Sequence, residues 1–277
     1  MIKKIITFLL LLISINAYSQ IRDKYDTKEI VRAGAKVCLG NEFDKYDTKE
    51  IIRENPDLVT VLVTKFDKYD TKEFIRAGAK VILCNNELDK YDIKEIIREN
   101  PNLVTVLVTK FDKYDTKEFV RTGAKVVLGN NQFDKYDIKE IIRESPNLVT
   151  VIVTKFDKYD TKEFVRAGAK VIIRNLALDK YDLKEIIREE PNLVTVIVIN
   201  FDKYDTKEIV RAGAKVILAN ELLDKYDIKE IIREEPTLVT VIIMKFDKYD
   251  TKEFIRAGAK VILNNQFDKY DIKDILN

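Results

Sequence analysis

The chain has 277 residues, of which 49 are Lys or Arg and 47 are Asp or Glu, and it contains neither His nor Trp. Without His, Ser-His-Asp and Cys-His nucleophile systems and the usual zinc sites are excluded. The near balance of charge argues against nucleic acid as a partner, because that binding depends on concentrated positive charge.

The first residues predict a signal peptide. Lys3 and Lys4 precede an apolar run from Ile5 to Ile15, and Ala17-Tyr18-Ser19 forms a small-x-small cleavage site. A membrane anchor is the alternative, but the run is short for a bilayer span. We therefore expect residues 1–19 to be removed and residues 20–277 to form a single secreted or periplasmic domain without a membrane span. Loss of the two lysines takes the 49 basic residues to 47, which equals the 47 acidic ones.

The tetrapeptide Asp-Lys-Tyr-Asp recurs through the rest of the chain. It begins at residues 23, 44, 67, 89, 112, 134, 157, 179, 202, 224, 247 and 268. Self-similarity at a fixed period of 22–23 residues is typical of a solenoid. Two versions of the unit alternate: one contains Ala-Gly-Ala-Lys-Val, as at 77–81, and the other Glu-Asn-Pro-Asn-Leu-Val, as at 99–104.

Each copy begins with residues that favour a helix start. In the copy at 67–76, Asp70 is the expected cap of the first amides, and Glu73 three residues later is expected to complete a capping box. Tyr69 is expected to pack on Phe74 as a hydrophobic staple, half buried between neighbouring helix starts. The sequence predicts the same arrangement in every copy.

The helix ends and the strands follow in the same order in each copy. Gly78 in one version, and Asn100 before Pro101 in the other, are expected to adopt the left-handed conformation that ends a helix. The segments that follow, 81–83 and 104–109, are rich in β-branched residues, which favours strands.

A helix between successive strands requires parallel pairing and right-handed crossovers. The sequence thus predicts an α/β fold: a right-handed helix-strand solenoid, bent into a curved arc, of about twelve 22–23-residue repeats with one parallel sheet and one layer of short helices. Eleven strands should give a sheet about 48 Å long, with its face on the concave side. A closed eight-stranded βα barrel is the alternative, but it needs longer units.

The segment Val81-x-Leu83-x-x-Asn86-x-Leu88 resembles the core of a leucine-rich repeat. The alternation of two unit types is similar to the ribonuclease-inhibitor class of that superfamily. The resemblance implies a horseshoe, core positions for Val81, Leu83 and Leu88, and an Asn86 that bonds to the backbone of a neighbouring loop. Gly78 stands where the usual consensus has its leading leucine.

Strand alternation assigns the two faces of the sheet. If Val81, Leu83, Val104 and Val106 face the helices, then Lys80 and the residues that alternate with them lie on the open face. This places a large exposed apolar patch there, of the kind a partner covers. The candidate partner-binding residues are Ile82, Thr105, Leu107, Ile152, Ile172, Arg174, Thr195, Ile197 and Ile217. We expect Arg174→Ser with Ile197→Glu to abolish binding and leave folding intact.

Other repeated residues have two interpretations. Aspartates such as Asp67 and Asp89 suggest a calcium ladder, but caps and surface ion pairs explain them better, so no metal is expected. The repeated tyrosines suggest a stacking ladder for sugars, but the staple is the simpler explanation. Cys38 and Cys84 lie two strands apart, beyond the reach of a disulfide, and are expected to be free thiols.

These observations predict a non-catalytic secreted scaffold that binds a protein, peptide or surface polymer through the open face of its sheet. The alternative is a structural cell-envelope protein that assembles with itself, through the sheet face or through the solenoid ends, which lack obvious polar caps. An enzyme is not expected, because every carboxylate recurs at the same position in each repeat. No cofactor is expected.

Overall fold

The computed structural model describes residues 23–84, 86–129, 132–174, 176–219, 221–263 and 266–276. The predicted signal peptide and its cleavage site lie outside these residues. The described residues form an α/β structure in which short helices and strands alternate. Its α-helices are α2 (Lys24–Arg32), α3 (Lys45–Glu54), α4 (Lys68–Arg76), α5 (Lys90–Glu99), α6 (Lys113–Arg121), α7 (Lys135–Glu144), α8 (Lys158–Arg166), α9 (Lys180–Ile187), α10 (Lys203–Arg211), α11 (Lys225–Ile232), α12 (Lys248–Arg256) and α13 (Lys269–Leu276).

The strands form one parallel sheet in sequential order, from β1 to β11. Its strands are β1 (Val37–Leu39), β2 (Val59–Val63), β3 (Lys80–Leu83), β4 (Val104–Val108), β5 (Lys125–Gly129), β6 (Val149–Val153), β7 (Lys170–Ile173), β8 (Val194–Val198), β9 (Lys215–Leu218), β10 (Val239–Ile242) and β11 (Lys260–Ile262). Every second strand follows a short 3-10 helix, as Pro101–Leu103 precedes β4. The single parallel sheet and the repeated helix-strand unit are as predicted.

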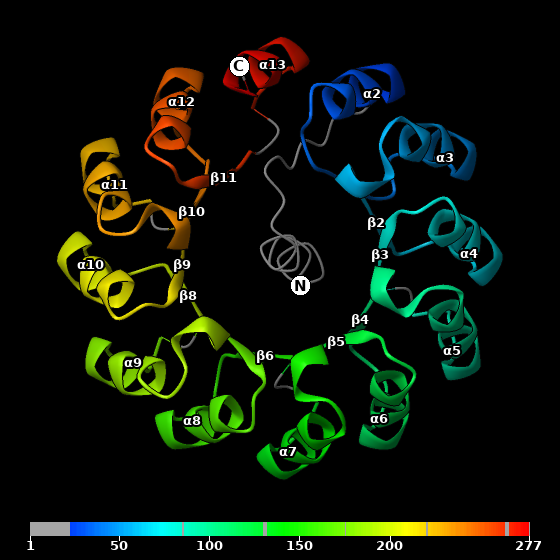
Figure 1. The fold of residues 1–277 in the computed structure, drawn as a ribbon, viewed down its shortest axis with the longest axis horizontal. Helices are drawn as coiled ribbons and strands as arrows, with labels where there is room; N and C mark the ends of the chain where they lie inside the picture. The colour runs from blue at the N-terminus through cyan, green and yellow to red at the C-terminus, as the bar shows by residue number, and fades with distance from the viewer. Residues whose placement is uncertain are drawn as a thin grey trace.

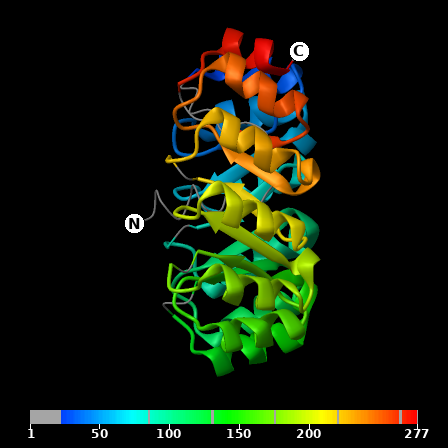
Figure 2. The ribbon, with the colours of Figure 1, turned by 90° about the vertical axis from the view of Figure 1, so that its left-hand side faces the viewer.

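The units are arranged in a ring. Figure 1 shows the strands lining its inside and the helices covering its outside, and Figure 2 shows the same ring edge-on as a disc. Consecutive strands pair with each other, and consecutive helices pack side by side. Because helices are wider than strands, each unit turns slightly, and the turn accumulates along the array.

The two ends of the helix layer meet, which corrects the expectation of an open arc or horseshoe. Helix α13 lies against α2, and Lys269 Nζ lies 2.6 Å from a carboxylate oxygen of Asp26. Lys273 Nζ donates to Glu29 over the same distance, 2.6 Å. The sheet does not close in this way, since in the described part of the chain β1 pairs only with β2 and β11 only with β10.

The helices begin one turn earlier than predicted. The cap of α4 is Asp67, whose Oδ1 accepts the backbone N–H of Asp70 at 2.8 Å, so the first aspartate of each tetrapeptide is the cap. The second aspartate instead binds the preceding helix, as Asp70 accepts from Lys45 Nζ at 3.0 Å. The staple prediction is also wrong: Phe74 packs edge-to-face on Phe66, with ring centroids 5.0 Å apart. Phe66 precedes the cap and Phe74 is the seventh residue of the helix, so this contact is not an N′–N4 staple.

The tyrosines of the tetrapeptides lie on the outside of the ring. Tyr69 is 69% exposed, and its equivalents in the other copies are similarly exposed, so their predicted half-burial is wrong. Each ring lies within cation–π distance of the preceding lysine, with Lys68 Nζ 5.5 Å from the Tyr69 centroid. Position 2 of the helix points away from the sheet, which explains the exposure.

The two versions of the unit end their helices differently. Gly78 has φ +93°, which confirms the left-handed end predicted for the first version. In the second version Asn100 has φ −164°, an extended conformation, and Pro101 starts the 3-10 helix. The left-handed prediction for Asn100 is therefore wrong, because proline confines the residue before it to the extended region.

The main core lies between the sheet and the helices. Val81, Leu83, Val104 and Val106 are at most 2% exposed and belong to this core, which confirms the predicted strand faces. Leu88 is buried there too, as the leucine-rich-repeat resemblance implied. The Asn86 side chain, however, accepts from the Thr109 hydroxyl at 3.3 Å rather than from loop backbone.

Candidate functional site: the inner face of the ring

The middle of the inner face is an apolar belt. Its members contact one another rather than the main core and are no more than 8% exposed, although they lie on the open side of the sheet. We define the belt as Cys38, Leu62, Ile82, Leu107, Val127, Ile152, Ile172, Ile197 and Ile217. Side chains on a concave face converge, and registered neighbours such as Ile152 and Ile172 cover each other.

The belt changes the interpretation of the candidate residues. Six of them, Ile82, Leu107, Ile152, Ile172, Ile197 and Ile217, are belt members and are buried. The large exposed apolar patch predicted from the sequence is therefore wrong, although the face was assigned correctly. Thr105 and Thr195 are half-buried beside the belt, and Arg174 is exposed.

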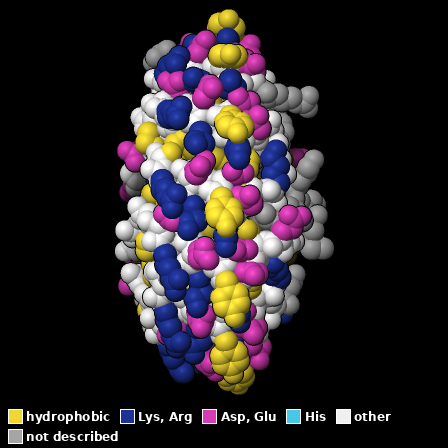
Figure 3. Space-filling view, turned by 90° about the vertical axis from the view of Figure 1, so that its right-hand side faces the viewer, with side chains coloured by type: hydrophobic (Ala, Val, Ile, Leu, Met, Phe, Trp, Pro, Cys, Tyr) yellow, Lys and Arg dark blue, Asp and Glu magenta, His cyan; other side chains and the backbone are white. Residues whose placement is uncertain are grey.

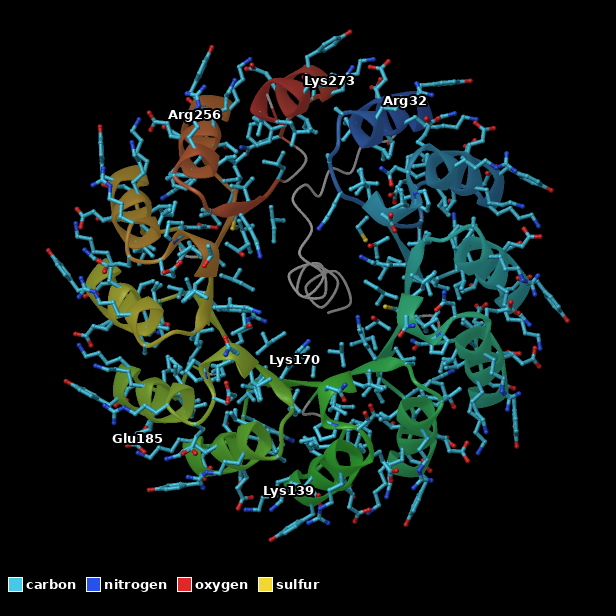
Figure 4. All side chains as sticks on the ribbon, in the orientation of Figure 1. Arg32, Lys139, Lys170, Glu185, Arg256 and Lys273 are labelled. Carbon is cyan, nitrogen blue, oxygen red and sulfur yellow. The ribbon has the colours of Figure 1, made fainter. Side chains whose placement is uncertain are left out.

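A second row of side chains lies at the mouth of the ring where the strands begin. From β3 on, each strand of the first version of the unit starts with a lysine, and the preceding strand places a threonine directly opposite it, as Thr150 pairs with Lys170. This lysine–threonine layer consists of Lys80, Lys125, Lys170, Lys215 and Lys260 with Thr60, Thr105, Thr150, Thr195 and Thr240. Figure 4 shows Lys170 directed into the ring.

The lysines of this layer are exposed and uncompensated. Within the described residues, none of the five lies within 4.0 Å of a carboxylate oxygen, and the five threonine side chains form no hydrogen bond there. Their neighbours in sequence explain the direction in which they point. Ala169 and Val171 face the helices and are buried, so strand alternation turns Lys170 inward.

The layer lines a cavity of about 390 Å³. All five lysines and all five threonines belong to its wall, together with belt residues such as Ile172 and with Asn102, Asn192 and Thr237 from the 3-10 helices. No acidic side chain is among the lining residues. Asp57 occupies the place of Asn102 in the first 3-10 helix and is exposed, but it is not part of the wall.

The outer face has the opposite electrostatic character. There, lysines and arginines of one helix pair with carboxylates of the next, as Lys72 and Arg76 both contact Glu99, at 2.9 and 2.8 Å. The hydrogen bond from Arg76 is the main cause that lowers the pKa of Glu99, and that from Lys72 comes second. Figure 3 shows basic and acidic side chains interleaved on this surface, with hydrophobic side chains in a row. The lysines of the outer helices are thus paired with carboxylates, whereas the inner lysines have no carboxylate partner among the described residues; outer arginines such as Arg98 and Arg143 also lack one there.

These lysines are not among the partner-binding residues predicted from the sequence. The available signal was an invariant lysine between a buried alanine and a buried valine in every Ala-Gly-Ala-Lys-Val unit. This lysine does not stand out among the many lysines of the chain, because the sequence of a single unit does not show that the equivalent side chains of all units point toward one axis. Lys36 occupies the same position before β1 and is half-buried.

The opposite mouth of the ring varies from copy to copy. Cys84, Gly129, Arg174 and Ala219 stand at equivalent positions after or at the end of their strands, and Cys84 and Ala219 pack against the belt. Cys84 and Cys38 are both free thiols, as predicted. Burial raises the pKa of the Cys84 thiol to about 12 and that of Cys38 well above its usual range.

Among the described residues, no group of three or more Cys, Asp or Glu side chains is arranged to hold a metal ion. In the same part of the chain, none of the helices has the length and apolar character needed to cross a bilayer.

Comparison with known proteins does not assign the chain to a family. No family model matches it, and no curated protein matches it in sequence. The solved structures it is similar to include mandelate oxidase, at 11% identity over 62% of this chain and 70% of that one, with a TM-score of 0.32. Another is a cube-shaped, highly porous designed protein cage, at 11% identity over 62% and 68% of the two chains, with a TM-score of 0.36.

The mandelate oxidase neighbours contradict the prediction that the chain is not an enzyme, and that prediction is withdrawn. The likeness is a weak similarity of fold, at 11–14% identity and TM-scores of 0.32–0.34, and it assigns no reaction to this chain.

Proposed function

We propose that the protein is a secreted or periplasmic repeat scaffold that binds a protein, peptide or surface polymer at the inner face of its sheet. In this proposal the chain is a right-handed solenoid, related in design to leucine-rich repeats, that is bent until its terminal helices meet.

One observation carries the proposal. The inner lysines have no carboxylate partner among the described residues, and no acidic side chain is among the described residues that line their cavity, whereas the lysines of the outer helices are paired with carboxylates of the neighbouring helix. Leaving charges unpaired in a shared cavity costs free energy through mutual repulsion. A partner that enters the ring offsets this cost, and binding regions are commonly built on such concave surfaces.

The self-assembly alternative has less support at the solenoid ends, one of its two predicted routes. The helical ends, which lack polar caps, contact each other within one chain, because α13 packs on α2.

The test compares two arginines that are both exposed. Arg174→Glu reverses a charge at the mouth opposite the lysines, and Arg143→Glu makes the same change at the end of α7 on the outer face. Proteins and polymers from the native envelope or medium are captured on each variant and on the unmodified protein. A partner held by the unmodified protein and by Arg143→Glu, but released by Arg174→Glu, supports inner-face binding. Equal retention by both variants overturns it.

A further inference from the structure

The lysine–threonine layer has the properties of a site for one particular class of ligand. We propose that it binds a compact small molecule carrying several phosphate groups, held on the axis of the ring. This inference rests on the proposed use of the inner face for binding and adds a second, small ligand at the lysine mouth, distinct from the macromolecular partner.

The charge of the cavity wall determines the charge of the ligand. Five lysines surround one cavity whose lining has no acidic side chain. A cavity lined by one sign of charge concentrates ligands of the opposite sign. The ligand is therefore anionic, and it carries several negative charges.

The shape of the ring indicates the shape of the ligand. The eleven strands span about 48 Å at about 4.8 Å per spacing, and the unpaired seam adds to this, so the inner circumference exceeds about 48 Å and the strand backbones lie at least about 8 Å from the axis. The five lysines lie on alternate strands from β3 to β11 and line the cavity with flexible four-carbon stems. A linear chain lying against the wall would meet only an arc of them. Anionic groups that radiate from a small core meet all of them, and 390 Å³ lies within the range of small-molecule sites.

The side chains of the lysine–threonine layer indicate which type of anion it binds. The layer contains no arginine, whose planar fork matches carboxylate and phosphate alike, so its ammonium groups act as point charges, as lysines commonly do toward phosphate. Each unit of the layer instead offers an ammonium group with a threonine hydroxyl on the neighbouring strand, as Thr105 lies opposite Lys125. A phosphate carries up to two negative charges and three acceptor oxygens, so one group takes bonds from both side chains.

The experiment titrates the purified protein with inositol hexakisphosphate by calorimetry at low salt. We expect saturable binding of one molecule per chain, weakened as salt rises. Orthophosphate should bind at least about a hundredfold more weakly, because it engages one unit rather than several. Melting should shift upward with the hexakisphosphate, since binding stabilises the folded state.

Matched variants locate the site. The inner triple variant combines Lys125→Gln, Lys170→Gln and Lys215→Gln and so removes three inner lysines. Each of the three substitutions is expected to weaken hexakisphosphate binding about tenfold. Lys94→Gln with Lys139→Gln and Lys184→Gln makes the same change in charge on the outer face and should leave the affinity within about twofold. Melting of both triple variants without ligand checks that they fold.

Three results would overturn the inference: no saturable binding of hexakisphosphate, equal loss in the inner and outer variants, or citrate binding as tightly as hexakisphosphate. These outcomes are separate from the capture test at Arg174. A partner that depends on Arg174 together with absent phosphate binding refutes the ligand class and leaves the scaffold function intact.

Discussion

At the scale of single residues, the repeat depends on a few positions whose backbone or burial allows little change. The glycine that ends the first-version helix is one of them. Gly168 has φ +89°, and an added Cβ would lie 3.0 Å from the Cβ of Pro146 in the preceding unit. It ends a helix and leaves room for the neighbouring 3-10 turn.

We expect Gly168→Ala to lower the free energy of unfolding by about 1–2 kcal/mol, because L-residues are strained in the left-handed region. Gly129→Ala is the matched control: nothing lies within 4 Å of its added Cβ, and its backbone is not left-handed. Urea unfolding of both variants measures the difference. Equal stability of the two variants would refute the role of the left-handed turn.

Ile197 shows how burial changes a prediction made from the sequence. It lies on the open side of the sheet but is 6% exposed, within the apolar belt. We now expect Ile197→Glu to lower the free energy of unfolding by about 3 kcal/mol or more, because it buries an unpaired charge. Ile197→Val should cost about 1 kcal/mol and serves as the control. A fully stable Ile197→Glu variant, judged by urea unfolding, would show that the belt is open to solvent.

At the scale of helices and strands, the outer ion pairs link each helix to the next. The last glutamate of a second-version helix accepts from the arginine of the helix before it, as Glu144 Oε2 accepts from Arg121 Nε at 2.7 Å. This hydrogen bond is the main cause that lowers the pKa of Glu144 below its usual value of 4.5, and Arg166 does the same to Glu189.

The direction of these shifts predicts the acid response. A carboxylate whose pKa is lower in the folded state stabilises the fold above its ordinary value of 4.5, and this contribution is lost as pH falls through the folded-state pKa. Stability should therefore decrease below about pH 4.5. The double variant Glu144→Gln with Glu189→Gln should show a shallower decrease of the free energy of unfolding at low pH. The control variant Glu190→Gln with Glu235→Gln changes glutamates outside these arginine pairs and should show the same decrease as the unmodified protein. Urea midpoints between pH 7 and pH 3 measure it, and identical slopes in both double variants would contradict the prediction.

At the scale of the whole molecule, the seam between α13 and α2 differs from every other helix interface. Elsewhere, neighbouring helices are also joined through paired strands, whereas at the seam the described strands β1 and β11 are not paired. The ion pairs from Lys269 and Lys273 to Asp26 and Glu29 therefore act without support from the sheet.

Reversing the seam charges should open the ring. Lys269→Glu with Lys273→Glu places like charges together, so we expect a larger radius of gyration in small-angle scattering. Adding Asp26→Lys and Glu29→Lys should restore it. Lys135→Glu with Lys139→Glu makes the same reversal between α7 and α8, where β6 and β7 remain paired, and should leave the radius unchanged. An unchanged radius in the seam variant would show that other contacts close the ring.

The sequence alone determined the repeating unit, the parallel sheet and the faces of its strands, because each follows from chemistry within some 22 residues. Alternation at Val81 and Leu83 and the lone Gly78 are local signals of this kind. The helix start was misplaced by one turn, because Asp67 and Asp70 are both good caps by residue type, and in the structure Asp67 Oδ1 accepts from the backbone N–H of Asp70.

Only the tertiary structure decided the closure of the ring and the convergence of the lysines. The sequence of a single repeat does not show the small rotation between neighbouring units. Summed over the array, this rotation brings α13 against α2. The same curvature buries Ile197 in the belt and turns Lys170 and its equivalents toward one axis. Residues that look alike in sequence thus become a paired outer surface or an uncompensated inner one, according to the side of the curve on which they lie.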